Sequence, residues 1–338
     1  MKRKIFKVLA GALLTLALAG AGTVYAEESG DGGTVKSYLT GEDVSAEIGR
    51  RRPVAIMLGN DQTGAPQSGL TQAGVIYEAP VEGQITRLMG IFENYDNLER
   101  IGSVRSCRDY YIFYANEFDA IYVHYGQAAY ALPYLEQHVI DNLNGLTMGS
   151  AAFYRTTDRK APHNAYTTPE LLQNGIATQG YSQEYSTDYT GHYLFAEDGS
   201  ETTLDNGASA TMVKLDNYSY NQPWFEYDET TKKYRRYQFG EAHIDELNGE
   251  QLTCDNIILQ YSSYQPYDSN GYLNVDVTTP GKGKFITRGK AIDIRWEKDS
   301  VWGVTHYYDE NEQEIRLNPG QTWVAIVQND RVDSITIQ

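Results

Sequence analysis

Arginine residues stand at a point in the first half of the chain where a loop is expected to enter a helix. The segment GSVRSCRD, residues 102–109, holds Arg105 and Arg108, and apolar residues then recur at helical spacing from Tyr110. A helix N-terminus presents free backbone N–H groups and a partial positive charge. An arginine fork matches the oxygens of a phosphate or a carboxylate. This segment therefore predicts an anion-binding site.

Other polar side chains lie beside apolar runs in the same half and would join this site if the fold brings them together. With Arg105 and Arg108, the candidate ligand-binding residues are Glu78, Glu82, Arg87, Asp109, His124, Arg155, Arg159, His163 and Asn164. The competing interpretation is internal pairing, in which Arg108 pairs with Asp109, and Glu78 or Glu82 pairs with Arg87, so that ion pairs only orient loops. Both interpretations stay open at this point.

Signatures of enzymes and metal sites are scarce. The chain holds no Gly-Lys-Ser/Thr phosphate loop, no Gly-x-Ser-x-Gly elbow and no His-Glu-x-x-His motif. Cys107 lies between two arginines, which would lower the pKa of its thiol, but no base is implied beside it. His124 and His163 match no zinc-ligand spacing. We therefore expect no metal and no cofactor, name no catalytic residue, and favour a protein that is not an enzyme.

The N-terminus has the pattern of a secretory signal peptide. Four basic residues within the first seven precede an uncharged stretch from Val8 to Ala26, which ends in small residues before Glu27. We expect export and cleavage after Ala26; the alternative is a retained membrane anchor, since the stretch is just long enough to span a bilayer. No cysteine stands near this point, so no attached lipid is expected, and no later stretch is apolar enough to cross a membrane.

Composition limits the partners. Loss of residues 1–26 removes four of 28 basic residues and none of 45 acidic ones, which lowers the net charge from −17 to −21. A chain this acidic should be repelled by nucleic acids and anionic lipid surfaces. It has 28 tyrosines against 9 phenylalanines, which suits either half-solvated strands or stacking platforms for sugars or peptides. The two cysteines, Cys107 and Cys254, fall in different predicted domains and are expected to be free and buried.

Apolar periodicity predicts an N-terminal α/β domain with a mixed sheet over residues 51–204, after a flexible leader over 27–50. Strands are expected at 54–58, 75–80, 85–94 and 120–125, with a hairpin turn at 82–84. Helices are expected at 104–118 and 128–139. A third helix should start at Pro169 behind the capping hydroxyl of Thr168 and run to about Gly175.

Helical periodicity disappears after about residue 200, and hairpin patterns take its place. We expect a mostly β C-terminal domain over residues 205–338. Its predicted strands are 224–227 with 233–237, 284–287 with 291–296, 305–308 with 314–317, and a closing strand at 322–327. The fold class predicted for the whole chain is thus α/β or α+β.

Several ordered motifs resemble the YerB family of bacterial envelope proteins. They span roughly residues 50–330 and include RPVAIM from Arg52, PQSGL from Pro66, VEGQITR from Val81, VRSCRDY from Val104, APHN from Ala161 and LNPGQTW from Leu317. The family is described as one of unknown function, found mainly in Gram-positive bacteria and often lipid-anchored. This chain departs from it in lacking a lipidation cysteine and in carrying Cys107 where the family more often has alanine.

The resemblance implies an envelope location and a two-domain layout, but no reaction. We therefore expect a non-enzymatic module that binds a cell-wall glycan, a lipid-linked phosphate or an envelope protein. A shorter similarity, of Thr86-Arg87 and the segment from Val104 to Asp109, is to LytR-CpsA-Psr phosphotransferases. In that alternative Arg87, Arg105 and Arg108 would hold a pyrophosphate, and Glu82 or Asp109 would bind Mg²⁺ or act as a base.

Overall fold

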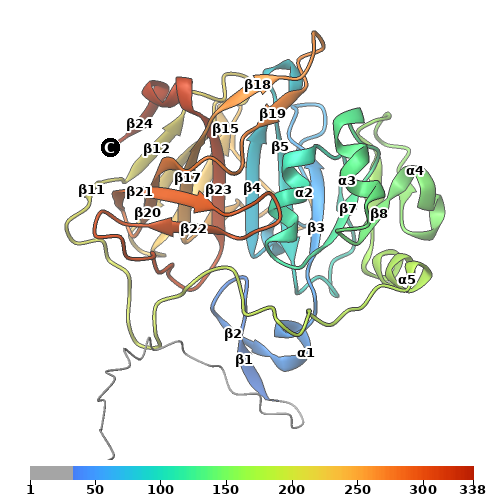
Figure 1. The fold of residues 1–338 in the computed structure, drawn as a ribbon, viewed down its shortest axis with the longest axis horizontal. Coiled ribbons are helices and arrows are strands. Elements are labelled where there is room, and N and C mark those ends of the chain that lie inside the picture. Colours follow the sequence, from blue (N-terminus) through green and yellow to red (C-terminus); the bar gives the residue numbers. More distant parts are fainter. Residues whose placement is uncertain (1–32) are drawn as a thin grey trace, which may run out of the picture.

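One mixed sheet passes through both halves of the chain (Figure 1). The structure is a computed structural model and describes residues 33–338. The first half contributes, in spatial order, the strands β4 (Val75–Pro80), β5 (Thr86–Phe92), β3 (Val54–Gly59), β7 (Ile121–His124) and β8 (Asn142–Asn144). The second half continues the sheet with β23 (Thr322–Gln328), β17 (Asn256–Ser262), β20 (Gly281–Thr287), β21 (Lys290–Lys298) and β11 (Ala208–Ser209), and β22 (Thr305–Tyr308) also pairs with β21.

The strand β23 joins the two halves at the middle of this sheet. It runs parallel to β17 on one side and parallel to β4 on the other. All seven of its residues are buried, in keeping with a central strand covered on both faces. The late segment Thr322–Gln328 therefore completes the sheet that the first half begins.

Helices and a second sheet cover the two faces. The helix α2 (Asp109–Asn116) packs on one face with Met57 and Tyr77, while α5 (Pro169–Gln179) packs on the other with Ile56. The second sheet also covers that other face, in the order β15 (Glu241–Ala242), β14 (Lys233–Gln238), β13 (Trp224–Asp228), β12 (Met212–Leu215) and β24 (Ile335–Ile337), with β16 (Thr253–Cys254) beside β14.

The remaining elements are short. The described chain starts with the pair β1 (Thr34–Lys36) and β2 (Asp43–Ser45), followed by α1 (Ala46–Gly49). A small sheet holds β6 (Ile101–Gly102), β10 (Ala165–Thr167) and β9 (Tyr154–Arg155), and a projecting hairpin holds β18 (Tyr264–Pro266) and β19 (Leu273–Val275). The last two helices are α3 (Leu132–Glu136) and α4 (Gly145–Met148), and 3₁₀ turns occupy 70–72, 82–84, 129–131, 149–151 and 329–334.

The predicted fold class is confirmed: a mixed sheet with helices in the N-terminal region and a mostly β C-terminal region. The turn at 82–84 joins β4 to β5, and the hairpins β13–β14 and β20–β21 form as predicted. The pairing of 305–308 with 314–317 is reduced to a single bridge, Tyr308 to Glu314. The helix at Pro169 is present, with Leu171 N donating to Thr168 Oγ1 at 3.2 Å, and it runs on to Gln179.

Two predicted helices are shorter than expected. Residues 103–108 are extended, because Gly59 N donates to Ser103 O at 3.1 Å and Arg105 N donates to Met57 O at 2.9 Å, so α2 starts only at Asp109. The second helix, expected over 128–139, is a 3₁₀ turn followed by α3. Apolar spacing does not distinguish a helix from a buried loop that is hydrogen-bonded to a strand.

The flexible leader expected over 27–50 is wrong from residue 33 onward, because β1, β2 and α1 pack against the main domain. Leu39 is fully buried in the core, and the Ser37 hydroxyl donates to the Glu93 carboxylate. The predicted signal peptide and its cleavage point lie outside the described residues. Between residues 33 and 338, no helix is both long and apolar enough to cross a membrane.

We expect docking of this N-terminal segment to depend on pH through Glu93. Burial raises the pKa of Glu93 from 4.5 to about 7, against the hydrogen bond from Ser37. A raised carboxyl pKa means that the folded state holds a proton that the unfolded state releases. The contribution of the Glu93 proton to the free energy of unfolding is therefore complete below about pH 4.5 and is lost as the pH rises through about 7. The total loss is at most about 3 kcal/mol.

Urea unfolding between pH 4.5 and 7.5 measures this effect, with Glu93→Gln as the comparison. The wild-type free energy of unfolding should fall relative to the variant as the pH rises. Parallel curves for the two proteins would show that Glu93 does not couple docking to pH.

Candidate functional site

The loop 103–108 crosses the carboxyl ends of two parallel strands, β3 and β7. Tyr125 N, just after β7, donates to Arg105 O at 3.0 Å, and Cys107 N donates to Gly126 O at 2.9 Å. Together with the bonds to β3, these contacts hold Arg105 and Arg108 at the carboxyl edge of the sheet. Ligands of open α/β sheets commonly bind at this edge.

Three arginines and two carboxylates meet at this edge, and we call Asp61, Glu82, Arg87, Arg105 and Arg108 the arginine cluster. Arg108 Nε donates to Glu82 Oε2 at 2.9 Å, and a second, closer contact joins Arg108 Nη2 to Glu82 Oε1. Arg105 Nη1 lies 3.1 Å from Asp61 Oδ2. Arg87 Nη2 is 3.8 Å from Glu82 Oε1, and Arg87 Nη1 donates to Ser106 O. The cluster therefore holds one more positive charge than negative charges.

Burial makes this excess charge costly. The side chains of Arg87 and Arg108 are each 5% exposed and that of Arg105 is 13% exposed. Burial, followed by the charge of Arg108, lowers the pKa of Arg87 to about 10, although Glu82 opposes the shift. Burial also lowers the pKa of Arg105, with Asp61 opposing. An anion beside these groups would relieve the repulsion between them.

His163 joins the cluster, whereas three other candidates form pairs beside it. His163 Nδ1 lies 2.9 Å from Arg105 Nη1 and 3.2 Å from Asp61 Oδ1, and burial lowers its pKa, so the neutral ring accepts from Arg105. Arg155 Nη1 donates to Asn164 Oδ1 at 2.7 Å. Arg159 Nη2 lies 2.8 Å from Glu246 Oε1, in the second half of the chain.

Glu78 and His124 are turned away from the cluster. Glu78 is fully buried and pairs with Arg236 at 2.6 Å. The His124 ring lies between Gly126 O at 2.8 Å and Asn142 Oδ1 at 3.2 Å, and burial lowers its pKa. Both side chains hold neighbouring segments together inside the protein.

Asp109 is the first residue of α2, and its carboxylate accepts from the Tyr267 hydroxyl at 2.5 Å. It lines a cavity of about 490 Å³ beside the β18–β19 hairpin rather than the arginine cluster. The predicted pairing of Arg108 with Asp109 is thus replaced by the pairing of Arg108 with Glu82.

Both cysteines are free and buried, as predicted. The expectation that the arginines lower the Cys107 pKa is wrong: burial raises the pKa of its thiol to about 12, although Arg108 opposes the shift. The thiol lies in the apolar core beneath the cluster. In the part of the chain that the structure describes, no group of three or more His, Cys, Asp and Glu is placed to hold a metal ion.

Tyrosines of the β18–β19 hairpin border the cluster, and sequence reasoning did not place them there. The Arg108 guanidinium carbon lies 5.2 Å from the centre of the Tyr272 ring. Tyr267 stacks on Tyr130 with ring centres 4.1 Å apart. The only sequence signal was the excess of tyrosine, which does not locate any of them. The site thus combines arginines from the first half of the chain with aromatic rings mainly from the second.

Two family descriptions match the chain. The N-terminal domain described as "Protein of unknown function (DUF3048)" matches residues 39–182, and the corresponding C-terminal domain matches residues 213–324. The chain is 30% identical over 306 residues to "Putative lipoprotein YerB" of Bacillus subtilis (strain 168), covering 87% of this chain and 86% of the relative. The crystal structure of the YerB protein from Bacillus subtilis matches with a TM-score of 0.80 at 31% identity, over 90% of this chain and 99% of that one.

The name of this relative bears on the expected N-terminus. Its name is "Putative lipoprotein YerB", which runs against the expectation that this chain carries no lipid. That expectation rests on the absence of a cysteine near residue 26, which lies outside the described part of the chain.

Proposed function

Because the chain belongs to the YerB family, both of whose domains it contains, we propose that it is an exported envelope protein that binds an anionic group of the cell wall without transforming it. The observation that supports this most is the arginine cluster, where three guanidinium groups meet two carboxylates at the carboxyl edge of the sheet. The proposed ligand is a phosphate-bearing glycan or a lipid-linked phosphate.

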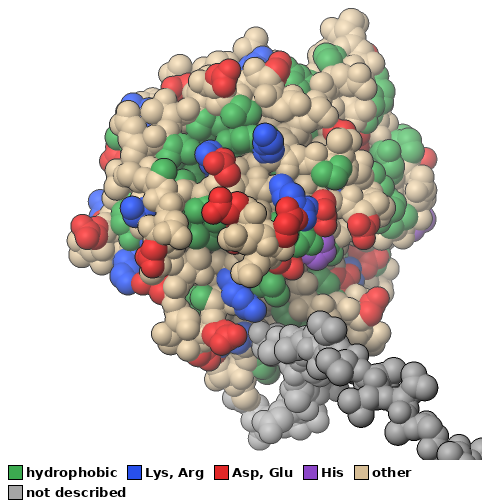
Figure 2. All heavy atoms as spheres, turned by 60° about the vertical axis from the view of Figure 1, so that its left-hand side comes forward, with side chains coloured by type: hydrophobic (Ala, Val, Ile, Leu, Met, Phe, Trp, Pro, Cys, Tyr) green, Lys and Arg blue, Asp and Glu red, His purple; other side chains and the backbone are tan. Residues whose placement is uncertain are grey.

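Local charge supports an anionic ligand. The whole chain has a net charge of −17, so its average field repels anions, and Figure 2 shows acidic side chains interspersed with basic ones on one face of the protein. The arginine cluster, in contrast, has a surplus positive charge. Arg105 is the most exposed of its three arginines and is the proposed first contact for the ligand. Guanidinium groups bind phosphate oxygens through paired, charge-assisted hydrogen bonds.

The tyrosines beside the cluster support a ligand that also carries a sugar. Tyr130, Tyr267 and Tyr272 are all partly exposed, and their rings lie beside Arg108 or stack on one another. Aromatic rings provide flat apolar surface with a polar edge, which suits the faces of sugar rings. A phosphate held by the arginines would thereby place an attached sugar near these rings.

The test is a calorimetric titration of the protein with inorganic pyrophosphate and with a polyprenyl phosphate in detergent micelles. We expect dissociation constants in the micromolar range, weakened about 10- to 100-fold in Arg105→Ala, because a charge-assisted hydrogen bond contributes about 1.5–3 kcal/mol. Arg288→Ala is the matched control, since Arg288 is also ion-paired and its side chain is 14% exposed. Its affinity should equal that of the wild type.

Two results would contradict the proposal. One is an affinity that is the same in the wild type and in Arg105→Ala, or no binding up to millimolar ligand. The other is release of phosphate from a polyprenyl-pyrophosphate substrate that disappears in Arg105→Ala, which would favour an enzyme over a binding protein.

Export is proposed on two grounds: the signal-peptide pattern of residues 1–26 and the name of the Bacillus subtilis relative. Fractionation of cells should place the protein with the envelope or the medium. Intact-mass measurement of the purified protein should give an N-terminus at Glu27, and it also reports any attached lipid. A mass that includes Met1 would contradict cleavage.

A further inference from the structure

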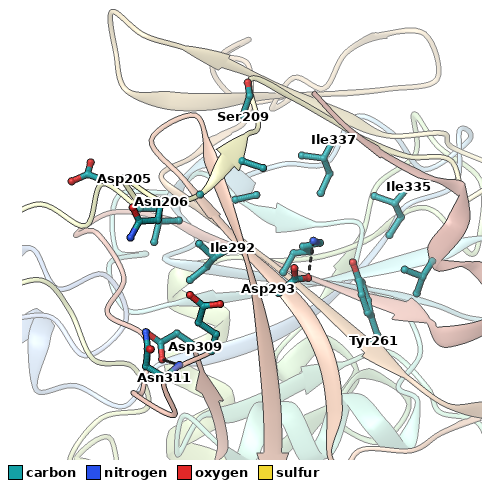
Figure 3. Close-up of a pocket in the computed structure, with 17 residues that line it drawn as sticks. Asp205, Asn206, Ser209, Tyr261, Ile292, Asp293, Asp309, Asn311, Ile335 and Ile337 are labelled. Atoms are coloured by element: carbon teal, nitrogen blue, oxygen red, sulfur yellow. Dashed lines mark hydrogen bonds and ion pairs between the residues drawn. The ribbon is translucent and has the colours of Figure 1, made fainter.

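An open trough lies where the second sheet meets the main sheet, far along the chain from the arginine cluster (Figure 3). Its volume is about 640 Å³. Its floor is the face of the main sheet, with Tyr261 from β17, Lys284 from β20 and Asp293 from β21. The strand β24 forms one wall, and the segments around Asp205 and Asp309 form the opposite end.

The wall formed by β24 is an open strand edge. Within residues 33–338, β24 is the last strand of its sheet and pairs only with β12. Met212 and Gln338 exchange both backbone hydrogen bonds, at 3.0 and 2.9 Å. Backbone groups alternate in direction along an antiparallel strand, so those of Thr336 also point to β12, whereas those of Ile335 and Ile337 point away from it.

Most of these outward groups have no backbone partner within residues 33–338. The Ile335 N–H donates to Val332 O at the end of the preceding turn. This leaves the Ile335 carbonyl and both backbone groups of Ile337 without a backbone partner among the described residues. An edge of this kind accepts an added strand.

The trough beside this edge has an apolar end and an acidic end. Figure 3 places Ile335, Ile337 and Tyr261 on one side and Asp205 and Asp309 on the other. The lining contains four carboxylates, from Asp205, Asp293, Asp309 and Glu310, and one lysine, Lys284, which is paired with Asp293 at 2.7 Å. The lining thus has a net charge of −3, which attracts a cationic occupant.

We propose that this trough binds an extended, cationic polypeptide segment of a partner protein, which adds as a strand to the free edge of β24. The backbone of the segment pairs with Ile337 and the carbonyl of Ile335. Its apolar side chains contact Tyr261 and the isoleucines, and its basic side chains lie among the carboxylates. This surface is separate from the arginine cluster, so the two sites are tested independently.

The probe is an acetylated and amidated heptapeptide, Val-Thr-Val-Thr-Lys-Thr-Lys, titrated into the folded protein by calorimetry and followed by NMR. Because strand side chains alternate between two faces, its two valines and two lysines lie on the same face, at opposite ends of the peptide. The expected result is saturable binding that weakens as salt is raised from 50 to 500 mM. The same peptide with glutamate in place of both lysines, which reverses its charge, should bind at least tenfold more weakly.

Two variants separate the backbone contact from the charge contact. Ile337→Pro removes an N–H that faces away from β12, which an edge strand tolerates, and should weaken binding at least fivefold; Ile337→Val keeps the N–H and should bind like the wild type. Asp205→Asn combined with Glu310→Gln should also weaken binding at least fivefold. The control for charge is Asp188→Asn combined with Glu229→Gln, two exposed acidic residues that do not line the trough.

Three results would overturn the proposal. The first is equal affinity for the two heptapeptides, and the second is no saturation at millimolar peptide. The third is unchanged binding by the Ile337→Pro variant when the melting temperature of that variant matches that of the wild type. Sedimentation velocity adds a fourth: a concentration-dependent dimer that Ile337→Pro abolishes would assign the edge to a second copy of this chain. If Ile337→Pro does not fold, amide methylation on one edge of the lysine-containing peptide replaces it, and undiminished binding of the methylated peptide would overturn strand addition.

Discussion

Replacement of Glu78 by alanine is expected to lower the free energy of unfolding by about 3–5 kcal/mol, because it leaves the guanidinium of Arg236 buried without its counter-charge. Both side chains are fully buried, and Glu78 Oε2 lies 2.6 Å from Arg236 Nη2. The other carboxylate oxygen accepts from Asn60, Thr86 and Asn221 at 2.8–3.1 Å. Urea unfolding followed by circular dichroism measures the loss.

A variant that removes both charges of the pair provides the internal control. A double variant, Glu78→Met with Arg236→Met, removes both charges and replaces them with apolar side chains, so its loss should be smaller than that of Glu78→Ala. Lys284→Ala, which breaks a partly exposed pair with Asp293, should cost less than about 1 kcal/mol. A loss below about 1 kcal/mol for Glu78→Ala would show that the buried pair does not hold the two halves together.

The second prediction concerns the expected boundary between the two domains at residue 204. We expect a fragment of residues 51–204 to remain unfolded when produced alone. Without the second half, β4 loses its parallel partner β23, and Glu78 loses Arg236. An exposed central strand and a buried charge without a partner each disfavour the folded state.

Circular dichroism and a two-dimensional NMR spectrum of the fragment test this expectation against the full chain. The full chain should unfold in one transition at which far-UV and near-UV signals coincide. A dispersed NMR spectrum for the fragment, or two separate transitions for the full chain, would show that residues 51–204 are an independent folding unit.

Local patterns in the sequence predicted most strands of the fold. The runs at Val54 and Val75 and the hairpins β13–β14 and β20–β21 have strong apolar patterns with clear turns, and all of them form. The third predicted hairpin, 305–308 with 314–317, is reduced to one bridge. The pairing of β23 with β4 was not predicted, because no local sequence pattern indicates that a strand near residue 325 lies beside a strand near residue 78. Parallel pairing across such a separation depends on the whole fold.

The candidate site was predicted only in part. The loop before α2 placed Arg105 and Arg108 together, whereas Arg87 was expected to join them only if the fold brought it there. Of the two carboxylates, Glu82 was a candidate and a proposed partner of Arg87, but Asp61 was not among the candidates. Glu78 resembled a site residue because a carboxylate in an apolar run is unusual. Its partner, Arg236, lies 158 residues away, so sequence spacing carried no sign of the pair.

The central position of β23 also bears on how the polypeptide is made. A ribosome makes the chain from its N-terminus, and β4 ends at Pro80 whereas β23 starts only at Thr322. At about 5–20 residues per second, the early strands wait roughly 12–50 s for their neighbour. During that interval the edge of β4 that later pairs with β23 has no strand beside it, so the main sheet is completed only after nearly the whole chain has been made.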